Sequence, residues 1–421
     1  MAKSEAPLSE VEDPTQTAAR ANSTWLTRTV FGVGVASLCS DLSHEMATTI
    51  LPLFLAQQIA ASAFALGLIE GLSDGLASAF KLVGGWWTDR TGKRKPIAVA
   101  GYTLTALATT SFSLAINWTM VLLSRSVAWA ARGGRTEARN ALLADSVEPK
   151  HYGKAFGFER SMDTIGAIFA PLIALGLVAA GFSYRQVFLM ALFPGLLAAC
   201  AMAFLVREKI KDARPERRLL GDLRRLPTGF RYYVLAVGVF GLGQFAPTLL
   251  ILRASQLLAP GHGSLKSSQW VIGLYVLFNV VQAASAYPWG SLSHRLGSIR
   301  LLGFSYALFA GAALGFAFAV GELWVLAALF ALAGLAVGGI EAMEPTAAAE
   351  FLPAEYRGTG YGALGAANGV GDFLSSTMVG ALWATIGAGA GFGFAAAFNL
   401  ISVFLLVALR HSFKRSVVAT P

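Results

Sequence analysis

Three ionisable side chains stand together in the first long hydrophobic run of this chain. Asp41, His44 and Glu45 are spaced i, i+3 and i+4, so a helix places them on one face. Charges inside a hydrophobic helix are costly and often mark ion or substrate pathways. A buried carboxyl group can load and release a proton as its surroundings change, and histidine can shuttle protons near neutral pH. The cluster predicts proton handling or substrate binding. A static ion pair with a neighbouring helix and a divalent-metal site are the alternatives.

Further charged side chains lie inside other hydrophobic runs. Arg132, Arg135 and Arg139 follow one another along the fourth run, and arginine forks match carboxylate or phosphate anions. They predict an anion site or a gate, unless they pair with acidic residues of the same half, namely Glu137, Glu159 and Asp163. The candidate proton-coupling or substrate-binding residues are Asp41, His44, Glu45, Lys81, Arg139, Asp163, Glu341 and Glu344.

The composition is that of a membrane protein. Hydrophobic residues make up 55% of the 421 residues and charged residues 14%, whereas a soluble domain carries about 25% charge. The net charge of +9 comes from basic residues that lie mostly between hydrophobic runs, so we expect no nucleic-acid binding. Two cysteines, Cys39 and Cys200, predict neither a disulfide framework nor a thiolate metal site. No cofactor is expected, and the polar start of the chain does not resemble a signal peptide.

Hydrophobic runs divide the chain into twelve predicted spans of an all-α membrane protein. They cover residues 26–58, 62–88, 96–116, 118–146, 153–181, 184–206, 232–258, 268–294, 299–319, 322–352, 356–387 and 389–411. The predicted organisation is a tail (1–25), a six-helix bundle (26–206), a basic linker (207–231), a second six-helix bundle (232–411) and a tail (412–421). Lys and Arg concentrate in alternate loops, which predicts that both termini are cytoplasmic.

The two halves match each other at a constant offset of 205 residues, as in 290 − 85 = 205. The shift places glycines on glycines: Gly85 on Gly290, Gly92 on Gly297, Gly133 and Gly134 on Gly338 and Gly339, Gly153 on Gly358, Gly157 on Gly362 and Gly166 on Gly371. The buried charges do not repeat, since Arg139 falls on Glu344 and Asp163 on Asn368. We therefore predict pseudo-symmetric bundles with asymmetric chemistry, and cross-half pairs that form in only one conformation.

One loop resembles a known family signature. The segment Gly85-x3-Asp89-Arg90-x-Gly92-Lys93-Arg94-Lys95 is similar to the loop between helices 2 and 3 of the major facilitator superfamily (MFS). The fourth run resembles a group of prokaryotic permeases in that superfamily whose substrates are mostly unassigned. The resemblance implies a central cavity and rocking between two open states. The residues with a predicted gating role, from the loop signature and the arginine stripe, are Gly85, Asp89, Arg90, Gly92, Arg132 and Arg135.

These observations predict a secondary transporter of a small polar or charged solute, and not an enzyme. The sequence contains no phosphate-binding loop and no hydrolase nucleophile motif, which argues against ATP hydrolysis and against a membrane hydrolase. The sequence has no sizeable sensory loop or domain, which argues against a receptor. We expect proton coupling, with antiport export favoured over uptake by symport. A divalent-metal or metal-chelate transporter using the Asp41 cluster is a further alternative. The expected setting is a monomer in the cell inner membrane, with the solute, protons and lipid as its partners.

Overall fold

The computed structural model describes residues 25–91, 93–148, 151–208, 226–352 and 357–418, whose regular elements are all helices. The first half holds α2 (Arg28–Gln57), α3 (Ala63–Thr91), α4 (Lys95–Thr110), the 3-10 helix η1 (Ser111–Leu114), α5 (Trp118–Asp145), α6 (Tyr152–Ala179), α7 (Tyr184–Met190) and α8 (Leu192–Phe204). The second half holds α9 (Thr228–Gly241), α10 (Thr248–His262), α11 (Ser264–Leu296), α12 (Ser298–Phe318), α13 (Leu323–Phe351), α14 (Arg357–Thr385) and α15 (Ala388–Val418).

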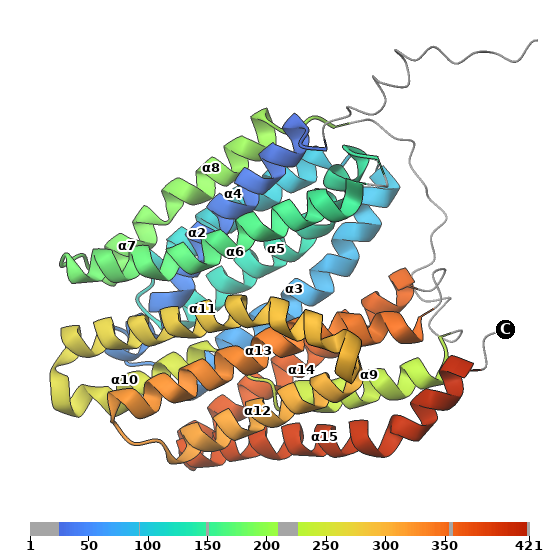
Figure 1. The fold of residues 1–421 in the computed structure, drawn as a ribbon. Coiled ribbons are helices and arrows are strands. Elements are labelled where there is room, and N and C mark those ends of the chain that lie inside the picture. The colour runs from blue at the N-terminus through green and yellow to red at the C-terminus, as the bar shows by residue number, and fades with distance from the viewer. Residues whose placement is uncertain (1–24, 92, 149–150, 209–225, 353–356, 419–421) are drawn as a thin grey trace, which may run out of the picture.

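These helices form twelve spans in two bundles, which confirms the predicted architecture (Figure 1). Three spans consist of two consecutive elements each: α4 with η1, α7 with α8, and α9 with α10. Eight of the described helical segments are long and apolar enough to cross a membrane on composition alone. The remaining spans fall short because α2 and α5 carry charges, α14 is rich in glycine, and residues 242–247 separate α9 from α10.

Side-chain caps start several helices where the sequence supplies a short polar residue. Thr27 accepts a hydrogen bond from the Val30 amide at 3.2 Å and begins α2. Asn117 accepts one from the Met120 amide at 2.9 Å and begins α5. Such caps satisfy amide groups that have no partner inside the helix. They fix the residues at which α2 and α5 begin.

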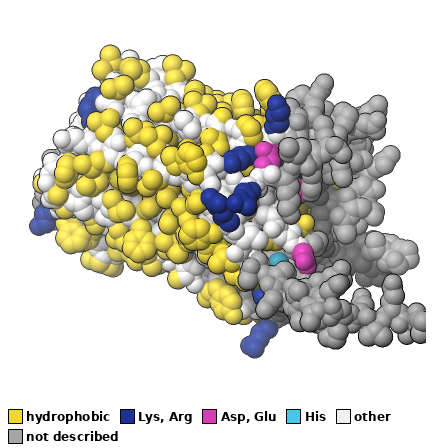
Figure 2. Space-filling model, turned by 90° about the horizontal axis from the view of Figure 1, so that it is seen from above, with side chains coloured by type: hydrophobic (Ala, Val, Ile, Leu, Met, Phe, Trp, Pro, Cys, Tyr) yellow, Lys and Arg dark blue, Asp and Glu magenta, His cyan; other side chains and the backbone are white. Residues whose placement is uncertain are grey.

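The start of α2 and the end of α8 lie at one end of the molecule, which we call the termini end. There, Arg28 at the start of α2 donates a hydrogen bond to the Phe204 carbonyl at 3.0 Å. The start of α9 and the end of α15 lie at the same end in Figure 1. We call the opposite end the far end. Figure 2 shows hydrophobic side chains over most of one lateral face, as expected for a surface that contacts lipid.

The internal repeat is visible in the helix packing. A Cβ on Gly133 of α5 would lie 2.2 Å from the carbonyl oxygen of Ala77 in α3. A Cβ on Gly338 of α13 would lie 2.5 Å from the carbonyl oxygen of Gln282 in α11. The same offset relates both partners, since 133 + 205 = 338 and 77 + 205 = 282. Small residues at these crossings let two backbones touch, so the repeated glycines preserve the same helix contact in both bundles.

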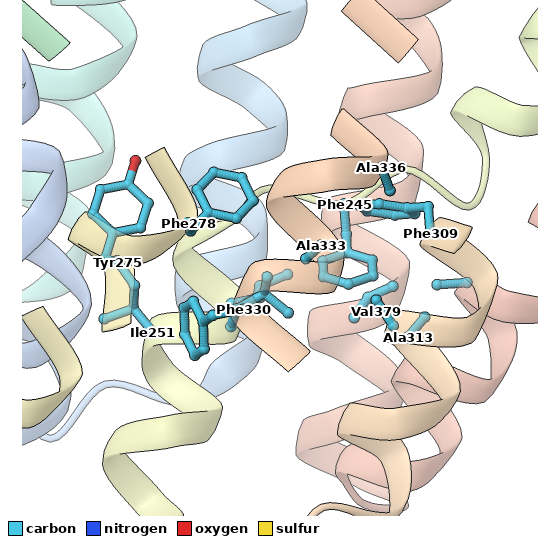
Figure 3. Packing of buried hydrophobic residues seen from close by; sticks show 14 of the residues in the cluster. Phe245, Ile251, Tyr275, Phe278, Phe309, Ala313, Phe330, Ala333, Ala336 and Val379 are labelled. Atoms are coloured by element: carbon cyan, nitrogen blue, oxygen red, sulfur yellow. The ribbon is translucent and has the colours of Figure 1, made fainter. Parts of the chain in front are cut away.

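The two bundles share one hydrophobic core at the far end. Met46, Ile50 and Phe54 of α2 belong to the same buried cluster as Phe245 and Leu249 of the other bundle. Figure 3 shows some residues of this cluster, among them Phe245, Tyr275 and Phe330. Toward the termini end the first bundle has a separate cluster of its own, which includes Val30, Val33, Tyr102 and Leu142. The bundles are therefore joined at the far end and packed separately toward the termini end.

Polar contacts seal the same end. The Tyr184 hydroxyl lies 2.8 Å from Ser268 Oγ, and Gln57 Nε2 donates to that Oγ at 3.1 Å. Ser268 belongs to α11, whereas Gln57 and Tyr184 belong to the first bundle. Because these three residues come from the far ends of α2, α7 and α11, they tie the bundles together only at that end.

Helices α3 and α14 cross at backbone distance between the bundles. A Cβ on Gly67 would lie 2.2 Å from the Ser376 carbonyl oxygen, and one on Gly71 would lie 2.5 Å from that of Phe373. On α14, a Cβ on Gly380 would lie 2.6 Å from the Ala63 carbonyl oxygen. The contact runs through these three glycines.

We expect Gly67→Ala to open the far end. The added methyl group meets a helix backbone that no rotamer change can move, so α3 and α14 must separate. Spin labels at Ile116 and Val320, two exposed far-end positions, report the separation. Their distance distribution should shift to longer values in a background in which Cys39 and Cys200 are replaced by alanine.

Gly176→Ala is the matched control for this measurement. Gly176 lies in α6, and a Cβ there meets no atom within 4 Å. Its spin-label distances should equal those of the parent. If Gly67→Ala also leaves the distances unchanged in a folded protein, this helix contact does not hold the far end closed.

Candidate functional site

His44 stands at the centre of the cluster that α2 carries, with 1% of its side chain exposed. Its Nδ1 lies 2.9 Å from the Ser40 carbonyl oxygen and 3.3 Å from Asp41 Oδ1. Its Nε2 lies 3.2 Å from Glu45 Oε1, without the alignment of a hydrogen bond. The other Glu45 oxygen accepts a hydrogen bond of 3.3 Å from Tyr275 of α11. The i, i+3, i+4 spacing thus does bring the three ionisable groups together, and it places them against the second bundle.

Asp41 faces a second carboxyl group across the helix interface. The Asp41 and Asp163 carboxyl groups lie close enough to interact, and Arg132 Nη2 lies 3.6 Å from Asp41 Oδ1. Gly166 makes this approach possible, since a Cβ there would lie 2.7 Å from the Leu38 carbonyl oxygen. Two carboxylates repel each other in a low dielectric, so a shared proton stabilises such a pair. Both residues were predicted members of the site, but their pairing was not predicted.

Asp163 also binds an arginine, Arg160, that reaches the second bundle. Its Oδ2 accepts a hydrogen bond of 2.9 Å from Arg160 Nη1. Arg160 Nη2 lies 3.9 Å from Glu341 Oε2 on α13. A cross-half pair was predicted, but between other residues: Arg139 and Glu344 each find their partner within their own bundle.

Arg135 and Arg139 of α5 have their partners within the first bundle. Arg139 Nη1 lies 2.7 Å from Glu159 Oε1 and donates to Ser37 Oγ at 3.0 Å. Arg135 donates to Ser40 Oγ at 2.6 Å, and its guanidinium stacks 3.8 Å above the Tyr102 ring. These contacts favour the structural alternative for Arg135 and Arg139. Arg132 is the most exposed of the three, at 33%.

A second buried network lies farther along α3, toward the far end. Arg125 Nη2 lies 2.5 Å from Glu70 Oε2, and both side chains are 2–3% exposed. The Arg125 guanidinium stacks 3.9 Å above the Trp129 ring, whose Nε1 donates to Asp74 at 2.9 Å. Trp129 also meets His44 edge to face at 5.8 Å. One aromatic ring therefore links this network to the Asp41 cluster.

Lys81 shares the α3 face with Glu70 and Asp74, as its spacing predicts. Its side chain is exposed, and none of the ion pairs among the described residues includes it. Its amine lies close enough to Asp74, Glu137 and Asp372 to feel their charges. Lys81 therefore stays a candidate by position only.

In the second bundle, Glu344 is buried without a cation. Its Oε1 accepts a hydrogen bond from Asn368 Nδ2, and its backbone carbonyl accepts one of 2.7 Å from Tyr233. Within the described part of the chain, no Lys or Arg lies within ion-pair distance of Glu344. A buried carboxyl group of this kind is costly as an anion, so it is suited to bind a proton or a cationic ligand.

A cavity of about 380 Å³ lies between α6, α13, α14 and the break that separates α9 from α10. It is lined by Arg160, Gln244, Ile340, Glu341, Glu344, Pro345, Tyr361, Leu364, Gly365, Asn368 and Asp372. Most of these residues belong to the halves of their helices that point to the termini end. The cavity is large enough for a small ligand, and it lies between the bundles on the side of the termini end.

The predicted gate residues are only partly described. The backbones of Gly85, Asp89 and Arg90 belong to the last turns of α3, but the side chains of Asp89 and Arg90 lie outside the described part, as does Gly92 altogether. Arg94 of the same loop forms an ion pair with Asp145 at the end of α5. One cation of the basic loop therefore joins α5 to the segment that leads into α4.

The geometry gives little support to the metal alternative. Within the described residues, no group of three His, Cys, Asp or Glu side chains converges to hold a metal ion. The His44 Nδ1 atom already has the Ser40 carbonyl oxygen as its hydrogen-bond partner.

Several residues of the site were not predicted, notably Gln244, Tyr275 and Tyr361. A single neutral polar residue in an apolar run is a weak signal, because many such residues merely bond to their own helix.

Comparisons with known proteins agree with this architecture. The sequence profile of the Major Facilitator Superfamily matches residues 33–263 and 254–419. An uncharacterized MFS-type transporter of Methanocaldococcus jannaschii is 27% identical over 359 residues, which cover 85% of this chain and 89% of that protein. The multidrug resistance protein MdtH of Edwardsiella ictaluri is 26% identical over 329 residues, or 74% of this chain and 76% of that protein.

Solved structures share the fold at low sequence identity. A peptide transporter POT in complex with sulfate superposes with a TM-score of 0.75 at 14% identity, covering 96% of this chain and 99% of the other. The nucleoside transporter NupG superposes with a TM-score of 0.72 at 14% identity, covering 92% and 99%. With twelve spans, two bundles and a profile match over nearly its whole length, the chain belongs to the major facilitator superfamily and is a multi-pass secondary transporter of a small molecule, not an enzyme.

Proposed function

We propose that this transporter is proton-coupled and that the Asp41–Asp163 carboxyl pair carries the proton. The observation behind the proposal is the close approach of two carboxyl groups from α2 and α6, where Gly166 lets the helices meet and the Asp41 and Asp163 side chains are 8% and 15% exposed. Holding the pair together requires a shared proton, and losing it leaves two adjacent negative charges. His44 and Glu45 lie next to Asp41 and supply a path along which the proton can move.

We further propose that the termini end faces the cytoplasm of a cell inner membrane and that the solute leaves by antiport. The basic residues at that end support the orientation through the positive-inside rule. On this proposal the cavity is open to the inside. The bundles at residues 26–206 and 232–411 rock about it, and Asp89 helps to close the termini end in the other state.

The proposal is tested with purified protein in liposomes that contain a pH-sensitive dye. A panel of amines, amino acids, sugars and organic acids is added outside, one at a time, across an imposed pH gradient. At least one solute should move protons through the parent protein. A protonophore should abolish the accumulation of that solute.

Glu322→Gln is the matched control for carboxyl substitutions. Glu322 precedes the far end of α13, is exposed and makes no cap hydrogen bond. It should transport like the parent. If solutes cross the membrane but none of them moves protons, the protein is a uniporter or uses another ion, and the proposed proton coupling is wrong.

A further inference from the structure

We propose that the cavity between the bundles binds a small organic cation, and that Arg160 is the built-in cation that this substrate displaces. The inference rests on the proposed transport function but concerns the substrate class. Its argument uses the charges, the hydrogen-bonding capacity and the volume of the cavity.

The charges that line the cavity are mostly negative. Glu341, Glu344 and Asp372 contribute three carboxyl groups, and Arg160 is the one Lys or Arg in the described lining. Arg160 is already committed to Asp163 on its own helix at 2.9 Å. Electrostatic complementarity therefore favours a positively charged ligand, and it disfavours an anion by bringing like charges together.

Hydrogen-bonding capacity points the same way. Asn368 gives its amide hydrogen to Glu344, and its Oδ1 is buried without a described partner. The Asp372 carboxyl group has no hydrogen bond or ion pair among the described contacts, and the nearby Lys81 amine, which lies outside the cavity lining, attracts it only at longer range. Glu344 is 5% exposed and has a neutral amide as its side-chain partner. Acceptors outnumber donors at this wall, and a ligand that carries N–H donors satisfies them.

The cavity volume limits the ligand to a small molecule. About 380 Å³ is at the lower end of the range for small-molecule sites. Ile340, Pro345 and Leu364 supply an apolar part beside the carboxyl groups. An amine with a compact apolar body therefore fits both the volume and the lining.

Arg160 connects this cavity to the proposed proton site. Its guanidinium reaches Asp163 at 2.9 Å and Glu341 at 3.9 Å, and its side chain is 66% exposed. With a shared proton, the Asp41–Asp163 pair has one negative charge, and without it the pair has two. The doubly charged pair attracts Arg160 away from Glu341, and a substrate cation can take its place. Proton and cation then exclude each other, as antiport requires.

The test compares three probes with one skeleton in detergent-solubilised, full-length protein. Phenylbutylamine is a cation near neutral pH, phenylbutanol is neutral and phenylbutyrate is an anion. Titration calorimetry and thermal unfolding report their binding. We expect the amine to bind at least about tenfold more tightly than the alcohol or the acid, a difference of about 1.4 kcal/mol.

Two exposed positions provide variants that should fold normally. Arg160→Gln removes the competing cation and should tighten amine binding about tenfold, whereas Glu341→Gln should weaken it by a similar factor. The matched controls are Lys154→Gln, an exposed cation on α6 away from the cavity, and Glu322→Gln on α13. Both should bind the amine like the parent.

Several results would overturn the proposed substrate class. They are tighter binding of the acid than of the amine, equal binding of all three probes, no binding of any probe, or an unchanged amine affinity in Arg160→Gln. Failure of proton coupling gives a different pattern. In that case the amine binds as expected, while the dye in the liposomes does not respond to it.

Discussion

Asp41→Asn is expected to abolish solute accumulation driven by a pH gradient, while solute exchange at saturating concentration continues. The asparagine amide can donate a hydrogen bond to Asp163, as the shared proton does, but it cannot release that proton. The variant is therefore held in the proton-loaded form of the site, which binds a cationic solute more weakly, so exchange is measured at saturating solute concentration. Liposomes measure both activities: accumulation under an imposed pH gradient, and exchange of labelled for unlabelled solute without one.

Infrared spectroscopy tests the same residue without a substrate. The parent should show the absorption of a protonated carboxylic acid, and Asp41→Asn should lack the contribution of the Asp41–Asp163 pair. Glu322→Gln should leave both the absorption and the accumulation unchanged. Full accumulation by Asp41→Asn would exclude this pair as the proton carrier, whatever the infrared result.

Arg125→Met should destabilise the protein by about 3–5 kcal/mol, because it leaves Glu70 as a buried charge without its cation. The two side chains lie 2.5 Å apart and are 2–3% exposed, so water cannot replace the lost partner. Methionine keeps an apolar contact with Trp129, so the loss reports the charge more than the packing. Reversible unfolding in detergent with added denaturing surfactant measures the change.

The double variant Arg125→Met with Glu70→Leu separates the charge effect from a packing effect. Removing both charges should restore most of the stability, since a buried ion pair is often no more stable than an apolar pair of similar volume. Lys154→Gln, an exposed substitution, should unfold like the parent. If the double variant is as unstable as Arg125→Met, the loss comes from packing and not from the unpaired carboxylate.

Most of the fold could be predicted from the sequence. Each span is a local property, because an apolar run of about 20 residues satisfies its own backbone hydrogen bonds wherever it lies in the membrane. The offset of 205 residues between the two halves was also visible in the sequence. In the structure it relates the contact of Gly133 with Ala77 to that of Gly338 with Gln282. The break between α9 and α10 was not predicted. Residues 242–247 remain apolar enough to continue a hydrophobic run, although their backbone leaves the helix there.

Many residues of the candidate site could be predicted from the sequence. Which charged side chains contact each other could not. The spacing of Asp41, His44 and Glu45 along one helix already determined that they would meet. No spacing indicates that Asp41 meets Asp163, or that Arg160 and not Arg139 reaches the second bundle. These contacts depend on how α2, α6 and α13 are rotated and how closely they approach.

The sequence by itself thus determined the membrane setting, the twelve spans, the duplicated scaffold and the asymmetric placement of charge. The tertiary structure alone decided which charges neutralise each other, which end is closed and where the cavity lies. The reason is physical. Hydrophobicity and helical period act along a single helix, whereas ion pairs and cavities depend on the relative orientation of helices that are far apart in the chain. That orientation is set at crossings such as those of Gly166 in α6 with α2 and of Gly67 in α3 with α14.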